Sequence, residues 1–180
     1  MKKSSLATIL CAIASAVAMP SQAAQISYSL QGLGGNEYRY DYSVLNDGST
    51  GGAVGLFDIL FDPALYDEAS LTISSDPSLS AAWDQQVLAS APGVPAAFDV
   101  LATQGGIAVG DSLSGFSMTF NWLGTGQPGA QGFEIYDPES FALLQTGTTS
   151  PVPLPGTLGL LACGIGGLLL LQRRSTGTCR

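Results

Sequence analysis

The chain has 180 residues, enough for one domain of ordinary size, and it contains no histidine. All fourteen acidic residues lie within residues 24–150, which hold a single basic residue, Arg39, so this segment carries a formal charge of −13. Because so acidic a surface repels phosphate backbones, nucleic acid is excluded as a partner.

The first 23 residues have the pattern of a secretory signal peptide. Lys2 and Lys3 precede an apolar stretch over residues 6–18, and Ser21 and Ala23 supply the small side chains that a cleavage site requires. An uncleaved anchor is the less favoured alternative, because the apolar stretch falls short of the ~20 residues of a spanning helix. We therefore expect cleavage after Ala23 and export across the inner membrane.

The C-terminal part of the chain has the pattern of a short membrane anchor. Residues 156–171 are uncharged and rich in leucine and glycine, and as a helix they rise about 24 Å against a hydrocarbon core of ~30 Å. Arg173 and Arg174 follow, so the positive-inside rule places the C-terminus in the cytoplasm and the preceding domain outside. We expect one transmembrane helix at about 156–172, suited to transient anchoring because glycines weaken it.

This end of the chain resembles a known sorting signal. Val152, Pro153, Leu154 and Pro155 precede the apolar run, and the arginine pair closes it. The order resembles the PEP-CTERM signal of Gram-negative bacteria, in the variant with leucine where glutamate is more usual. The resemblance implies processing by an exosortase, an integral-membrane cysteine transpeptidase-like enzyme, after transient residence in the inner membrane. It also implies release to the cell surface or the extracellular matrix.

Two segments of the intervening domain, residues 38–48 and 129–137, are similar to ectodomains that commonly precede PEP-CTERM signals. Those ectodomains carry no common assigned activity, so this similarity implies a location and a shape only. The expected organisation is a signal peptide over 1–23, an ectodomain over 24–150, a sorting signal over 151–175 and a cytoplasmic tail over 176–180.

Alternation of apolar and polar residues predicts an all-β ectodomain, an antiparallel β-sandwich. The clearest predicted strands cover residues 26–30, 38–44, 57–61 and 116–122, and shorter ones cover 71–73, 98–101, 133–136 and 141–144. Clusters of glycine, proline, asparagine and aspartate separate these segments, as expected for turns. Only residues 63–68 and 80–88 are helical candidates, and both are short.

The ectodomain lacks the side chains of most hydrolytic and metal-dependent sites. Without histidine, cysteine or lysine, residues 24–150 cannot form Ser-His or Cys-His pairs, a lysine Schiff base, or histidine or thiolate metal sites. Glu134, Asp137 and Glu139 cluster, and a glycosidase requires only a pair of carboxylates. We favour a solvated acidic turn around Asp137, and we predict no catalytic residue and no enzyme activity.

Calcium is the ion most compatible with this composition, because it takes carboxylate and carbonyl oxygens. Asn46, Asp47 and residues 62–68 are candidate loops for low-affinity calcium, but EF-hand spacing is absent from the sequence, so no metal site or cofactor is predicted. Residues 124–129 match G-x-G-x-x-G, yet a strand pattern follows, which predicts a β-turn rather than a dinucleotide site.

Aromatic side chains offer another kind of binding site. Tyr38, Tyr40, Tyr42, Trp83 and Trp122 could form a platform that stacks on sugars, although alternation places most of them in the core. Trp83 lies outside the strong strand patterns and is the best candidate for exposure. Two functions follow: a non-catalytic surface or extracellular-matrix protein associated with exopolysaccharide or biofilm, or alternatively a carbohydrate-binding module in the same location.

Overall fold

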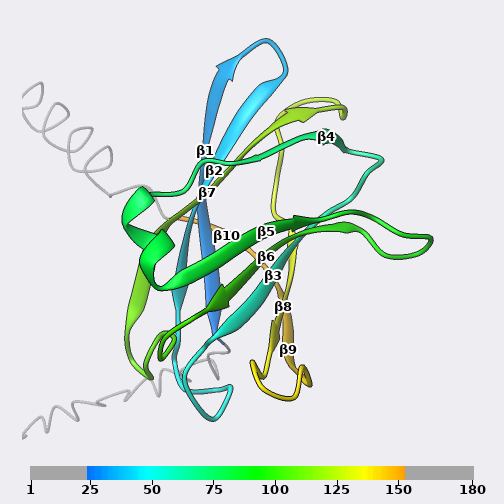
Figure 1. Cartoon of the computed structure of the whole chain (residues 1–180). Helices are drawn as coiled ribbons and strands as arrows, with labels where there is room; N and C mark the ends of the chain where they lie inside the picture. The colour runs from blue at the N-terminus through cyan, green and yellow to red at the C-terminus, as the bar shows by residue number, and fades with distance from the viewer. Residues whose placement is uncertain (1–23, 153–180) are drawn as a thin grey trace, which may run out of the picture.

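The computed structural model describes residues 24–152, which form two facing β-sheets (Figure 1). The strands are β1 (Gln25–Gly34), β2 (Glu37–Leu45), β3 (Leu56–Phe61), β4 (Tyr66–Ile73), β5 (Trp83–Leu88), β6 (Ala96–Ala102), β7 (Ser112–Trp122), β8 (Gly132–Tyr136), β9 (Leu143–Thr148) and β10 (Ser150–Pro151). Within residues 24–152, no helix is both long and apolar enough to cross a membrane.

Several predicted features fall outside the described residues. They are the signal peptide with Ser21 and Ala23, the transmembrane helix, the cytoplasmic tail, and Pro153, Leu154, Pro155, Arg173 and Arg174 of the sorting signal. Val152 is the one residue of the Val-Pro-Leu-Pro motif that the structure describes, and its amide donates a hydrogen bond of 2.8 Å to the Tyr28 carbonyl.

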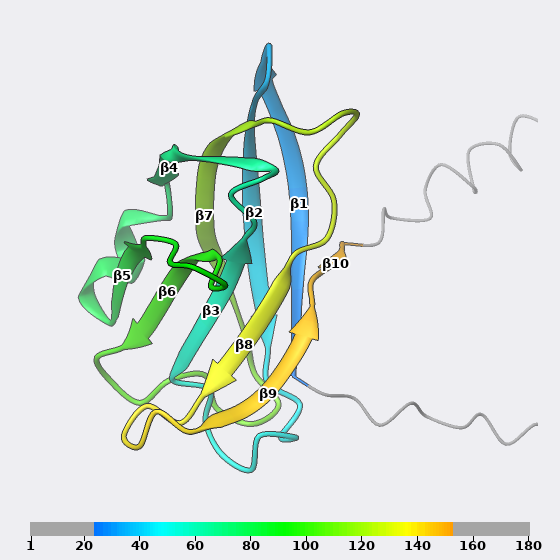
Figure 2. The ribbon, with the colours of Figure 1, turned by 90° about the vertical axis from the view of Figure 1, so that its right-hand side faces the viewer.

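Each sheet has five strands, in the orders β10-β1-β2-β7-β4 and β5-β6-β3-β8-β9. The predicted all-β sandwich is therefore confirmed. Neighbouring strands run antiparallel except for β1 and β10, which pair in parallel through Ser27 with Ser150 and Tyr28 with Pro151. The chain passes from one sheet to the other at Thr149, between β9 and β10 (Figure 2).

The core lies between the sheets and is built by the alternation seen in the sequence. On β2, Tyr40, Tyr42 and Val44 are buried while the residues between them are half-exposed. On β7, Phe116, Met118 and Phe120 are buried. Burying one face of each strand removes large apolar areas from water, which is the main term that stabilises such a sandwich.

Both helical candidates are wrong. Residues 63–68 make a turn, because the Asp62 side chain accepts the Ala64 amide, and then enter β4, where Tyr66 pairs with Trp122 of β7. Residues 80–88 contain the end of the 3-10 helix η1 (Pro77–Ala81) and then all of β5, which pairs with β6. Pairing with neighbouring strands determines the conformation of both segments, and a short apolar run in the sequence does not reveal that pairing.

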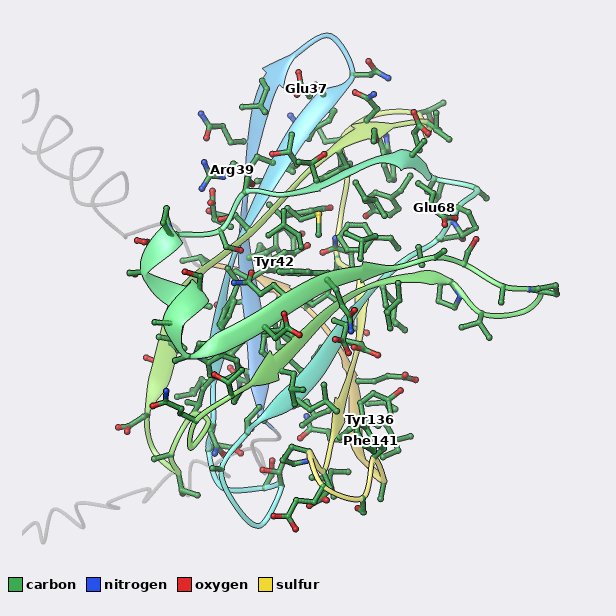
Figure 3. The ribbon with its side chains drawn as sticks, in the orientation of Figure 1. Glu37, Arg39, Tyr42, Glu68, Tyr136 and Phe141 are labelled. Carbon is green, nitrogen blue, oxygen red and sulfur yellow. The ribbon has the colours of Figure 1, made fainter. Side chains whose placement is uncertain are left out.

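The last predicted strand is displaced along the chain. The alternation predicts that this strand starts at Phe141, but Phe141 lies in the β8–β9 turn with φ of 55° and a side chain that is 66% exposed. The turn forms because the Asp137 carboxylate accepts the amides of Glu139 and Ser140. As a result, β9 begins only at Leu143, near the labelled Phe141 and Tyr136 in Figure 3.

Candidate functional site

A cleft of about 730 Å³ opens at one end of the sandwich, between the two sheets. Its walls come from both sheets and from the β5–β6 hairpin: Leu60, Pro63, Leu65, Val94, Pro95 and Trp122. Of the residues that line the cleft, Asp62 alone is charged. A concave, mainly apolar site with a few polar groups is the usual form of a small-molecule site.

The polar part of the cleft is centred on Gln131, just before β8. Its side chain is only 4% exposed, and its Nε2 donates a hydrogen bond of 2.8 Å to the Tyr42 hydroxyl. Its Oε1 is buried and has no hydrogen-bond partner. A buried carbonyl oxygen without a partner among the described residues is costly, so Gln131 leaves one polar group of the cleft lining unsatisfied.

Buried tyrosine hydroxyls form the layer beneath this side chain. The Tyr40 hydroxyl donates to the Gly129 carbonyl at 2.6 Å and lies 3.3 Å from the Tyr66 hydroxyl, and Tyr66 also lines the cleft. Burial raises the pKa of both the Tyr42 and Tyr66 hydroxyls above their ordinary value. These groups therefore stay protonated and uncharged at neutral pH.

Trp122 forms an aromatic wall of the cleft. Its ring meets that of Tyr66 edge to face, with centroids 5.0 Å apart. Gly124 lies against the indole, since a Cβ there would come within 2.6 Å of the Trp122 Cζ2 atom. The indole Nε1 is buried without a partner. The G-x-G-x-x-G segment thus serves as an irregular connection that leads into β8 and contributes to the cleft.

A hydrogen-bonded contact holds the β5–β6 hairpin beside β4. Glu68 accepts the Ser90 amide at 3.0 Å and the Ser90 hydroxyl at 2.6 Å. These bonds lower the pKa of the Glu68 carboxyl, which therefore remains ionised. Figure 3 shows Glu68 on the side of the molecule from which the hairpin projects.

Trp83 is buried, so the prediction that it is the best candidate for exposure is wrong. Its side chain is 6% exposed and packs against Phe116 and Phe57, with ring centroids 5.3 and 6.3 Å away. It opens β5 opposite Ala102 of β6 on the inward face. The sequence signal was weak because β5 has only one other apolar residue, Val87, on the same face.

The five aromatic residues do not assemble into an exposed platform. Tyr40 and Tyr42 are buried, as the alternation predicted. Tyr38 is half-buried and stacks on Phe120 with centroids 6.1 Å apart, and it lies outside the cleft lining. Trp122 alone among the five lines the cleft.

A row of carboxylates crosses the outer face of the second sheet. Asp58 of β3 pairs in register with Asp99 of β6 and with Glu134 of β8. Partial burial, followed by the contacts with Asp99 and Glu134, raises the pKa of Asp58 to about 7. No pattern in the sequence indicates this row, because it depends on the register between strands that are distant in the chain.

The predicted acidic cluster is not assembled as a pair. Glu134 lies on β8, where it belongs to the row with Asp58 and accepts a hydrogen bond from the Tyr136 hydroxyl. Asp137 lies in the following turn, where it accepts the Ser140 amide at 2.7 Å. The Asp137 carboxylate thus serves the turn, in the way that the favoured interpretation expected. These bonds lower the pKa of Asp137.

In the candidate calcium loop at Asn46 and Asp47, most side-chain polar groups form hydrogen bonds within the domain. Asn46 is fully buried and donates to the carbonyls of Gly52 and Ile107 at 2.9 and 2.8 Å. Asp47 accepts the Ser49 amide through Oδ1. Within residues 24–152, no group of three acidic side chains, the Asp58 row included, has the geometry to hold a metal ion.

No protein-family model and no curated protein matches the chain. Solved structures that resemble it include the chitin-binding domain of Chi18aC from Streptomyces coelicolor, at 20% identity over 61% of this chain and 89% of that one, with a TM-score of 0.39. A type I cohesin–dockerin complex from Clostridium thermocellum matches at 11% identity over 71% and 99%, with a TM-score of 0.34.

The seventh ScaB type I cohesin from Pseudobacteroides cellulosolvens matches at 12% identity over 73% of this chain and 94% of that one, with a TM-score of 0.33. Similarity at this level is too low to extend a ligand or a partner from these proteins to this chain.

Proposed function

We propose that the protein is an exported, non-catalytic surface or extracellular-matrix protein, sorted and processed through its C-terminal signal by an exosortase. The observation that carries this proposal is the order of Val152-Pro153-Leu154-Pro155, the apolar run and Arg173-Arg174 directly after the last strand. The sandwich is then released to the cell surface or to an exopolysaccharide matrix.

The position of β10 supports this proposal. Pro151 pairs with Tyr28, and Val152 still bonds to the β1 backbone, so the chain is held in extended form up to the start of the motif. The alternate prolines 153 and 155 remove backbone donors and favour extended conformations of the residues before them. An extended segment at the edge of a folded domain is a form that a processing enzyme can bind.

Mass spectrometry of the native protein's two termini tests the proposal. Protein recovered outside the cell should start at Ala24 and lack the arginine cluster, whereas Pro153→Ala, Pro155→Ala protein should stay membrane-bound with an intact C-terminus. Pro128→Ala is a matched control, because it removes a proline outside the signal and should be processed normally. Intact Arg180 on extracellular wild-type protein would contradict the proposal.

The second candidate is a carbohydrate-binding module in the same location, and the cleft favours it. Gln131 and Trp122 both line it, so a side-chain amide and an indole ring lie beside a ligand in the cleft. The walls are apolar and suit the C–H faces of a sugar ring. The acidic surface disfavours anionic glycans, so a neutral sugar is the expected ligand.

Titration with neutral cello- and chito-oligosaccharides, followed by calorimetry or NMR, tests this candidate. Val94 at the cleft is 59% exposed, and Val94→Asp should weaken binding about tenfold or more by placing a charge beside the ligand. Val109→Asp is the matched control, since Val109 is 58% exposed and lies outside the cleft. Equal affinities of the two variants, or no binding by wild type, would exclude the cleft as a site for these sugars.

A further inference from the structure

Two acceptors converge on the backbone nitrogen of Ala24, the residue before β1. The Ser49 hydroxyl lies 2.8 Å from this nitrogen and the Gln145 Oε1 lies 3.1 Å from it. Ala24 itself is 1% exposed. A peptide nitrogen has one hydrogen to share between these acceptors, whereas an α-ammonium group has three.

The two acceptors are held in place by further hydrogen bonds. Gln145 Nε2 donates to the Ala24 carbonyl at 2.8 Å, so the Gln145 side-chain amide bonds both to the backbone nitrogen and to the carbonyl oxygen of Ala24. The Ser49 hydroxyl lies 3.2 Å from Gln145 Oε1, and the Ser49 amide donates to Asp47 Oδ1 at 2.9 Å. The other carboxylate oxygen of Asp47 is buried and has no hydrogen-bond partner.

Electrostatics also favour a cation at this position. Arg39 is the only basic side chain within residues 24–152, and its guanidinium pairs with Asp41 at 2.7 Å. Fourteen carboxylates share the same domain, so an added positive charge reduces their mutual repulsion. Hydrogen bonds from a charged donor are also stronger than those from a neutral amide.

We propose that Ser49 and Gln145 form a binding site for the mature N-terminus, the α-ammonium group of Ala24. Hydrolysis of the Ala23–Ala24 peptide bond consumes one water, leaves a carboxylate on Ala23 and frees the amine of Ala24, which takes up a proton. The two acceptors then bind this ammonium group. The site rests on the proposed export and cleavage, and it adds a structural reason for the cleavage position.

The site also joins the two sheets. Ala24 leads into β1 of one sheet, and Gln145 lies on β9 of the other, 121 residues away in the chain. In the precursor, the one peptide hydrogen of Ala24 is shared between the two acceptors. Cleavage supplies further hydrogens and therefore strengthens this contact between the sheets. Signal removal in this way also strengthens the packing of one sheet on the other.

Amine labelling gives a direct test, because the only lysines of the chain are Lys2 and Lys3. A chain that starts at Ala24 has one primary amine, so an amine-reactive ester followed by intact mass measurement reports on that group alone. Such a chain can be made in a heterologous cytoplasm by removal of an initiator methionine, independently of export.

The folded wild-type chain should label about tenfold or more slowly than the same chain in denaturant, because the amine must first leave its acceptors. Ser49→Ala, Gln145→Ala protein should label at close to the denatured rate while remaining folded by circular dichroism. Thr148→Ala, on the same strand and exposed, is the matched control and should label like wild type. Equal rates for folded wild type and the double variant would overturn the proposal.

An N-terminal Gly-Ser extension provides a second measurement. It removes the ammonium from Ala24 and should lower the melting temperature by about 3 °C or more in wild type, and by less in the double variant. Equal losses in both proteins would overturn the site and leave the export proposal standing. A native-host protein that still starts at Met1 would instead overturn export, whatever the labelling rates.

Discussion

The carboxyl of Asp58 has a residue-scale consequence for stability. Its pKa rises from 3.8 to about 7 on folding, mainly through burial and then through Asp99. The folded state therefore binds the proton more tightly than the unfolded chain, so this group's contribution to stability is present below about pH 4 and is lost as the pH rises towards 7. At neutral pH the row of carboxylates destabilises the sandwich.

Asp58→Asn should therefore raise the free energy of unfolding at pH 8 by about 1 kcal/mol, a value reduced for the partial solvent exposure of the group. At pH 4 the variant and wild type should differ by less than about half of that. Urea unfolding at both pH values measures the difference. Asp84→Asn removes the same charge from an exposed position of the same sheet and is the control. A pH-independent difference would contradict the interpretation.

Other residue-scale features mark the limit of what sequence could predict. Gln131 is a buried amide in a connection, and nothing in its neighbours indicated a cleft. Trp122 was recognised as the end of an alternating strand, but its position beside Tyr66 depends on the pairing of β4 with β7. Alternation specifies which side chains face inward, whereas cleft walls are assembled from several strands and a hairpin.

At the scale of elements, long alternating segments were predicted well and short ones poorly. Residues 38–44 and 116–122 have four apolar residues each on one face, and both lie in strands, although β7 begins four residues earlier, at Ser112. The sequence pattern of residues 80–88 does not indicate their conformation, because the end of η1 and all of β5 share a short segment with few apolar residues. Their conformation is decided by pairing with β6, which belongs to a later part of the chain.

The connection between β6 and β7 offers a prediction on glycine. Gly105 and Gly106 both have positive φ, at 65° and 70°. A Cβ on Gly106 would lie 2.6 Å from the Val54 carbonyl oxygen, whereas a Cβ on Gly105 would meet nothing within 4 Å. Gly105→Ala should cost about 1 kcal/mol for backbone strain alone, and Gly106→Ala about 1–3 kcal/mol more.

Denaturant unfolding of the two variants separates the backbone strain from the steric clash with Val54, because both substitutions introduce similar backbone strain. Val54 and Ile107 exchange backbone hydrogen bonds of 2.8 and 3.0 Å beside this turn, and these bonds must shift in the Gly106 variant. Equal destabilisation by the two substitutions would contradict the close approach of this turn to Val54.

At the scale of the whole molecule, the formal charge of −13 on residues 24–150 predicts a dependence on salt. Carboxylates repel one another over a Debye length, which falls from about 30 Å at 0.01 M to about 8 Å at 0.15 M ionic strength. Raising sodium chloride over this range should increase the melting temperature by a few degrees.

Divalent cations distinguish screening from a specific site. Millimolar calcium should stabilise the protein, and magnesium at the same ionic strength should stabilise it equally, because the described residues present no cluster arranged as a metal site. Differential scanning calorimetry in the two salts measures this. A markedly larger effect of calcium would instead support the candidate loops at Asn46, Asp47 and residues 62–68.

The parallel pairing of β10 with β1 also determines how the domain responds to tension. A pull on the chain beyond Val152 acts first on the Val152–Tyr28 hydrogen bond and on two paired residues of β10. While these bonds hold, the force passes into β1; once they separate, it acts at Thr149, whose amide bonds to the Gln131 carbonyl beside the cleft. The short edge strand is therefore expected to separate first, which lengthens the pulled segment before the other strands lose their pairing.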